Sequence, residues 1–156
     1  MLHSVVFDPP DIQMRNDAIW YTFITHAEVN GMSVLRGNAS DEEFKETVRL
    51  RRQGKPNHKL KGVLSFRCNA VRRLSAATDS NGRKVGDRLY CVLDTDIAGR
   101  PSHADVFATL PLPYDKSVAK QAFRSQRKSL MDAIGNAIEK PSAFRNGILD
   151  DTQSVA

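Results

Sequence analysis

The densest group of chemically active side chains in this 156-residue chain lies between Asp94 and Asp105. The segment reads Asp-Thr-Asp-Ile-Ala-Gly-Arg-Pro-Ser-His-Ala-Asp and follows an apolar run, and loops at strand ends often carry sites. Asp94, Asp96 and Asp105 offer the oxygens that Mg²⁺ or Mn²⁺ prefers. His103 suits metal ligation or acid–base catalysis, and Arg100 suits bidentate binding of a phosphate or a carboxylate. These residues predict a catalytic loop; because Asp, Gly, Pro and Ser are also common turn residues, a purely structural loop is the alternative.

The uneven distribution of charge predicts a positively charged face. The chain has a net charge of +5, and no acidic residue occurs from Thr47 to Thr78. A basic stretch of this kind attracts phosphate-bearing partners, although a solvated loop with guarded strand edges is an alternative. The stretch has neither a phosphate-binding Gly-Lys-Ser/Thr pattern nor interleaved aromatic residues, so phosphate contacts are the expected mode. The candidate nucleic-acid-binding residues here are Arg49, Arg51, Arg52, Lys55, Lys59 and Lys61.

A second basic stripe falls on the long helix predicted over residues 114–140, which ends before Pro141. Four basic residues recur there at intervals of four, beside an apolar face. Such a stripe fits contact with nucleic acid or an acidic protein surface, or a surface helix whose basic side chains extend over the edge of the core. Its members are Lys116, Lys120, Arg124 and Lys128.

A further candidate group comprises His26, Glu28 and Arg36. Asn30-Gly31 is a typical two-residue hairpin turn, and residues 32–35 would form the returning strand. The hairpin would place the three side chains on one face.

The elements needed to position these residues predict an α+β fold. Ser40-Asp41-Glu42-Glu43 is a capping box that begins a helix ending near Arg52. The expected architecture is a small, mainly antiparallel sheet, with this capped helix and the long C-terminal helix packed on it. Residues 61–71 and 88–93 are predicted strands, paired as a hairpin around a turn at 79–82. Residues 18–24 and 104–110 fit either a helix or a strand.

The composition predicts one globular domain over residues 1–141 and a frayed tail over 142–156. No apolar run is long enough to cross a bilayer, and no secretory signal is recognised, so no membrane partner is expected. Cys68 and Cys91 lack the spacing of a metal or redox motif and are expected to be reduced, buried thiols in opposite strands of a cytoplasmic protein.

Three short motifs resemble those of small bacterial proteins of unknown function. They are Ser33-Val34-Leu35-Arg36, Asp94-Thr95, and Pro101-Ser102-His103-Ala104-Asp105. The resemblance covers the middle half of the chain. It implies a bacterial or phage source and draws attention to His103, but it implies no activity.

Two classes of function follow. The first is a basic binding module that contacts nucleic acid or another phosphate-rich partner, and the asymmetric charge favours it. The second is an enzyme acting on a nucleotide-like or phosphate-containing substrate, with His103 and the carboxylates at its centre. A subunit of a larger assembly, with the aromatic N-terminal segment as its interface, is a third possibility. Cofactors and oligomeric state stay open.

Overall fold

The structure, a computed structural model, describes residues 1–15, 18–78, 84–109 and 116–150. Its centre is a six-stranded sheet in the order β10-β5-β1-β4-β9-β8, and every neighbouring pair is antiparallel. The α+β class with a mainly antiparallel sheet is therefore confirmed. The sheet strands are β1 (Leu2–Asp8), β4 (Met32–Arg36), β5 (Lys59–Phe66), β8 (Tyr90–Asp94), β9 (His103–Ala108) and β10 (Ile138–Glu139). Two small ribbons pair β2 (Ile12–Arg15) with β3 (Ala18–Tyr21) and β6 (Ser75–Thr78) with β7 (Lys84–Arg88).

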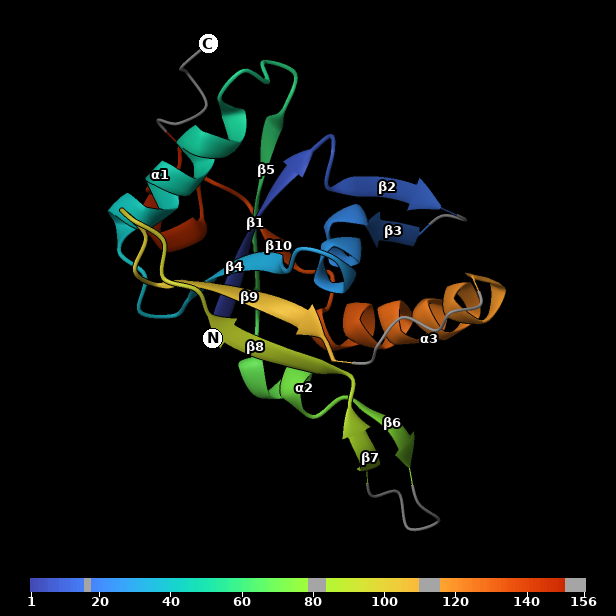
Figure 1. Cartoon of the computed structure of the whole chain (residues 1–156). Coiled ribbons are helices and arrows are strands. Elements are labelled where there is room, and N and C mark those ends of the chain that lie inside the picture. Colours follow the sequence, from blue (N-terminus) through green and yellow to red (C-terminus); the bar gives the residue numbers. More distant parts are fainter. Residues whose placement is uncertain (16–17, 79–83, 110–115, 151–156) are drawn as a thin grey trace.

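Helical segments cover both faces of the sheet (Figure 1). On one face lie α1 (Asp41–Arg52) and the 3₁₀ segment η2 (Phe144–Gly147). On the other lie the 3₁₀ helix η1 (Thr22–Glu28), α2 (Cys68–Arg72) and α3 (Lys116–Ile134). The chain therefore forms three layers with two apolar cores.

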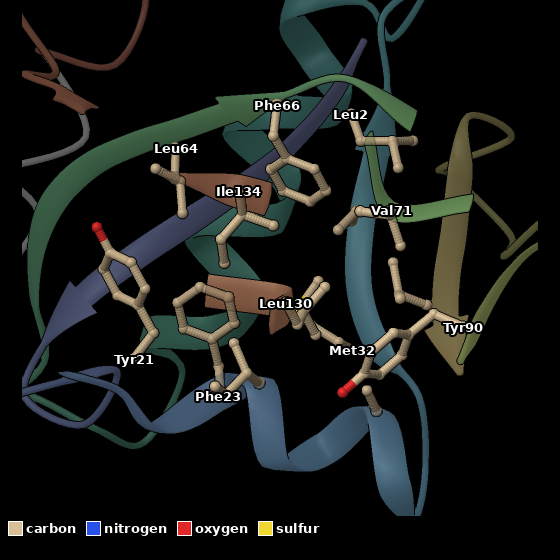
Figure 2. Packing of buried hydrophobic residues seen from close by; sticks show 14 of the residues in the cluster. Leu2, Tyr21, Phe23, Met32, Leu64, Phe66, Val71, Tyr90, Leu130 and Ile134 are labelled. Carbon is tan, nitrogen blue, oxygen red and sulfur yellow. The ribbon is translucent and has the colours of Figure 1, made fainter. Parts of the chain in front are cut away.

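Successive side chains of a strand point to opposite faces of the sheet, so each strand contributes to both cores. In β1, Leu2 and Val6 face the η1 and α3 side, whereas Val5 and Phe7 face α1. Figure 2 shows Leu130 and Ile134 of α3 among the side chains that fill the larger core. None of the described helices is both long enough and apolar enough to cross a lipid bilayer.

The start of α1 has both hydrogen bonds of a capping box. The Glu43 amide donates to Ser40 Oγ at 3.2 Å, and the Ser40 amide donates to Glu43 Oε2 at 2.8 Å. Phe44 and Val48, one turn apart, are buried against the sheet. The second Glu43 oxygen, Oε1, accepts the amide of Ser102 at 2.7 Å. The cap of α1 is thus joined to a segment 59 residues further along the chain.

The strand pairing differs from the sequence-based expectation. The strand expected at residues 61–71 ends at Phe66, and Cys68 begins helix α2. β5 pairs with β1 and β10, while β8 pairs with β9, so the expected hairpin between the two segments is wrong. The cysteines do not lie in opposite strands, and both are half-buried free thiols. β9 follows β8 closely in the chain and pairs with it along one edge, and no other described strand pairs with β8. The turn expected at 79–82 lies outside the described residues.

Two ambiguous segments are now assigned. Residues 18–24 divide between β3 and η1, which explains why both strand and helix patterns fit them. Residues 104–110 fall mainly in strand β9. Asn30-Gly31 does not turn a hairpin: it follows η1, and Gly31 has a φ of 88°, a conformation that suits glycine. β4 then pairs with β1 and β9 instead of with the preceding segment.

The C-terminal region is more structured than expected. α3 ends at Ile134, before Gly135 with its φ of 73°, so it is shorter than the helix expected at 114–140. Phe144 and Leu149 are 3% and 0% exposed, because they complete the core between α1 and the sheet. The expectation of a frayed tail is therefore wrong for residues 142–150, and residues 151–156 lie outside the description.

We expect the two members of the capping box to differ in their contribution to stability. Ser40→Ala removes one cap acceptor and should cost about 1 kcal/mol. Glu43→Gln should cost more, about 1–3 kcal/mol, because one of two amides loses its acceptor. Urea denaturation at neutral pH measures the free energy of unfolding of both variants. If Glu43→Gln lost no more stability than Ser40→Ala, the role of Glu43 as acceptor for both amides would be contradicted.

The advantage of Glu43 over glutamine should also depend on pH. Burial raises the pKa of Glu43, but hydrogen bonds from Ser40 and Ser102 outweigh it and hold the pKa below its usual 4.5. The ionised carboxylate of Glu43 therefore stabilises the fold fully above pH 4.5. This stabilisation is lost as the pH falls through the lower pKa that Glu43 has in the folded state. The difference in unfolding free energy between wild type and Glu43→Gln should shrink in acid.

Candidate active site

A pocket of about 310 Å³ opens where β1 and β4 separate beside α1. These strands pair only at Leu2 with Arg36 and at His3 with Leu35. Beyond that point β1 continues along β5 while β4 continues along β9, so the two strands diverge (Figure 1). All four histidines of the sequence border the pocket: His3, His26, His58 and His103.

One stripe of α1 supplies the wall of the pocket. Glu43, Thr47 and Arg51 are spaced by four residues and therefore share a helix face. Glu43 binds the Ser102 amide, and Thr47 lines the pocket. Arg51 donates to the Val5 carbonyl at 2.5 Å, so it bonds to the strand edge that the divergence leaves open. These three polar side chains attach α1 to the borders of the pocket and leave the pocket itself open.

At the other wall, four polar side chains of β4, β9 and the preceding loop form a ring of close polar contacts. Ser33 stands opposite Asp105 in the strand register, and His103 is two residues earlier on β9. Ser33 Oγ lies 3.2 Å from both His103 Nε2 and Asp105 Oδ1. Thr95 Oγ1 lies 2.6 Å from His103 Nδ1 and 2.9 Å from Asp105 Oδ2. His103 and Asp105 are buried, while Ser33 is exposed, so the ring presents its serine to solvent.

The hydrogen bonds of this ring define the tautomer of His103. The carboxylate of Asp105 can only accept, so Thr95 must donate its single proton to it. The Thr95 oxygen is then free to accept from His103, which places the imidazole proton on Nδ1. Nε2 is left with a lone pair directed at Ser33 Oγ.

His103 is held in its neutral form near pH 7. Burial lowers its pKa below 6.5, and the nearby charge of Arg100 lowers the pKa further, although Asp105 opposes the shift. Arg100 also lines the pocket, and its buried Nε has no hydrogen-bond partner among the described residues. The single proton of Ser33 can go to Asp105 Oδ1 or, after the hydroxyl rotates, to His103 Nε2. A neutral imidazole whose lone pair faces the serine oxygen, with a cation beside it, is suited to remove that proton.

Arg36 fixes the loop between β8 and β9. Its guanidinium donates to Asp94 at 3.0 Å, to Asp96 at 3.4 Å and to the Pro101 carbonyl at 2.6 Å. Asp94 and Asp96 are thus paired with a cation, and only Asp105 of the three carboxylates joins the ring with His103. Within the described ranges, no group of three or more His, Cys, Asp or Glu side chains is placed to hold a metal ion.

The second group expected from sequence is not assembled. Glu28 pairs with Arg127 of α3 at 2.5 Å, and Arg36 pairs with the β8–β9 loop. His26 is exposed in η1 and borders the pocket. The three side chains were expected together because of the hairpin that the structure does not form.

The basic residues are more dispersed than the sequence indicated. Arg49 pairs with Glu46 at 2.7 Å, and Lys128 pairs with Asp132 at 2.9 Å. Arg51 pairs with Asp11, which is 3% exposed, so Arg51 does not belong to a solvated basic face. Lys55, Lys59, Lys61 and Arg124 are exposed, Arg52 is half-buried, and the side chains of Lys116 and Lys120 lie outside the described part.

The sequence-based analysis gave no site role to Ser33, Thr95 or His58, whereas Lys55 was already a candidate phosphate contact. Ser33 occurred in a motif that resembled bacterial proteins, together with the motif of His103. The available signal was that each motif overlaps a segment that can form a strand, but only the pairing register places Ser33 opposite Asp105. His58 gave no signal, because its environment depends on the divergence of β1 from β4.

Comparisons of this chain with protein-family models, curated proteins and solved structures give no match.

We expect Arg51→Glu to destabilise the fold strongly. The substitution leaves the buried Asp11 carboxylate without its partner, and breaking such a pair costs about 3–5 kcal/mol. Lys55→Glu is the matched control, because this exposed lysine should change stability by less than about 0.5 kcal/mol. Thermal or urea denaturation that gave equal stabilities would contradict the structural role of Arg51.

Proposed function

We propose that the chain is an enzyme that cleaves an ester bond in a small molecule, with Ser33 as nucleophile and His103 as general base. The observation that carries the proposal is the 3.2 Å contact between Oγ of the exposed Ser33 and Nε2 of the buried His103. A serine hydroxyl is a weak nucleophile until an adjacent base can take its proton. The pocket beside it supplies room for a substrate.

The proposed reaction begins when Ser33 Oγ attacks the ester carbonyl carbon and its proton moves to His103 Nε2. The carbon–oxygen bond to the leaving alcohol then breaks, and His103 returns the proton to that alcohol. Water, activated by the same histidine, hydrolyses the acyl-enzyme and restores Ser33. Arg100 would stabilise the oxyanion of each tetrahedral intermediate, because it lines the same pocket as Ser33 and His103.

The remaining polar residues have positioning roles in this proposal. Thr95 and Asp105 keep the proton of His103 on Nδ1 and hold the ring in place. Arg36, through Asp94 and Asp96, holds the loop that carries Arg100. This arrangement follows the logic of a serine–histidine–carboxylate site, with a threonine inserted between histidine and carboxylate.

Nucleic-acid binding is a second candidate, supported by the exposed lysines near the end of α1. Lys55, Lys59 and Lys61 are exposed and have no ion pair within the described residues. They fit phosphate contacts whose affinity falls steeply with salt. Substitution of these three lysines, instead of Arg51, would test this candidate without breaking a buried ion pair.

We expect a fluorophosphonate probe to label Ser33. The serine oxygen forms a bond to phosphorus, fluoride leaves, and the proton passes to His103. Ser33→Ala should abolish the mass increase seen by intact-protein mass spectrometry. Ser65→Ala is the matched control: Ser65 Oγ also contacts a histidine, His3 Nδ1 at 2.8 Å, but it does not line the pocket. Labelling that survives Ser33→Ala would contradict the proposal.

The labelling rate should also report the state of His103. His103→Asn should slow labelling on the order of a hundredfold or more, because general-base assistance is lost. In the folded wild type, the rate should be level at neutral pH and fall only in acid, since the pKa of His103 lies below 6.5. A rate that climbs tenfold per pH unit through neutrality would instead indicate an unassisted serine.

A further inference from the structure

The pocket has a second end, formed by the turn that follows α1. The His58 amide donates to the Lys55 carbonyl at 3.0 Å, so these two residues close a tight turn, and both line the pocket. This turn follows the C-terminal end of α1, whereas Ser102, the neighbour of His103, is bound to Glu43 in the first turn of the helix. The pocket therefore runs along α1, with Ser33 and His103 toward one end and Lys55 and His58 toward the other.

The end formed by Lys55 and His58 has polar groups with no partner in the described structure. His58 Nδ1 is buried and has no hydrogen-bond partner there, although its ring packs against Phe7 at a centroid distance of 6.3 Å. Lys55 is exposed and has no ion pair with any described residue. A buried polar atom without a partner is uncommon in folded proteins and calls for a ligand or water.

The charges at this end favour an anion. Arg51 is balanced by Asp11, which leaves the positive charge of Lys55 uncompensated in the pocket wall. A phosphate monoester carries nearly two negative charges at neutral pH and three acceptor oxygens. Lysine binds phosphate as a point charge, and the imidazole of His58 can donate from Nδ1.

We infer that Lys55 and His58 form a phosphate subsite, so that the substrate is an ester that also carries a terminal phosphate. The inference rests on the proposed function, because it names the substrate class of the same pocket. From Glu43 to Arg52 the helix rises about 13 Å, so the phosphate and the reacting carbonyl should be separated by a distance on the order of 10 Å. The phosphate anchors the substrate and takes no part in bond cleavage.

Calorimetric titration with inorganic phosphate tests the subsite separately from catalysis. Wild type and Ser33→Ala should bind phosphate equally at millimolar concentration. Lys55→Gln and His58→Gln should each weaken binding on the order of tenfold, the expected effect of one lost charge-assisted hydrogen bond. Lys59→Gln is the matched control, since this exposed lysine is near in sequence but does not line the pocket, and it should bind as wild type does.

The outcomes separate this inference from the proposed function. No phosphate binding, or binding that Lys55→Gln and His58→Gln leave unchanged, would overturn the subsite even if Ser33 is labelled. A wild-type protein that binds phosphate but is not labelled by the fluorophosphonate probe would overturn the esterase and leave the subsite. A single-stranded oligonucleotide that binds more tightly than phosphate, and that Lys59→Gln weakens as much as Lys55→Gln, would assign these lysines to a nucleic-acid surface and overturn the subsite.

Discussion

The buried carboxylate of Glu43 is the interaction on which the arrangement of the site depends. One of its oxygens completes the cap of α1, and the other accepts the amide of Ser102, immediately before His103. A single side chain therefore determines where α1 begins and where β9 enters the sheet. Because both amides donate to a carboxylate that water barely reaches, neither bond can be exchanged for solvent without cost. This shared acceptor sets the spacing between the helix wall and the strand wall of the pocket.

The divergence of β1 from β4 follows from the same constraint. The helix held by Glu43 places Arg51 beside the open edge of β1, where its guanidinium binds a carbonyl that a strand would otherwise pair. Near β9 the sheet face is not covered by apolar helix residues, so the polar ring of Ser33, His103, Asp105 and Thr95 fills it. Gly31 permits the close approach at this corner, since a Cβ there would lie 2.8 Å from the Asp105 side chain. The polar ring and the pocket thus occupy a region where the layers do not close over each other.

Features that depend only on residues close together in the chain could be predicted from the sequence. The capping box around Ser40 and the turn-rich loop from Asp94 to Asp105 depend on neighbouring residues, and His103, Asp105 and Arg100 do lie near one another or the pocket. Strand partners could not be derived in this way, because β5 and β8 each fit several neighbours by pattern alone. The same limit hid Ser33, whose role depends on register, and the pairing of Arg51 with Asp11, which depends on α1 crossing β1. Charge counted along the chain overestimated the basic face because it could not show which cations are paired.

The central claim is that His103 directs a lone pair, not a proton, at Ser33. Nitrogen-15 NMR of the histidine rings in the wild-type protein at neutral pH measures this directly, with His103 assigned by comparison with His103→Asn. The account predicts a neutral ring with its proton on Nδ1, bound to Thr95, and a bare Nε2. A ring protonated on Nε2 would contradict the account, because Ser33 would then accept from the histidine and could not be activated by it.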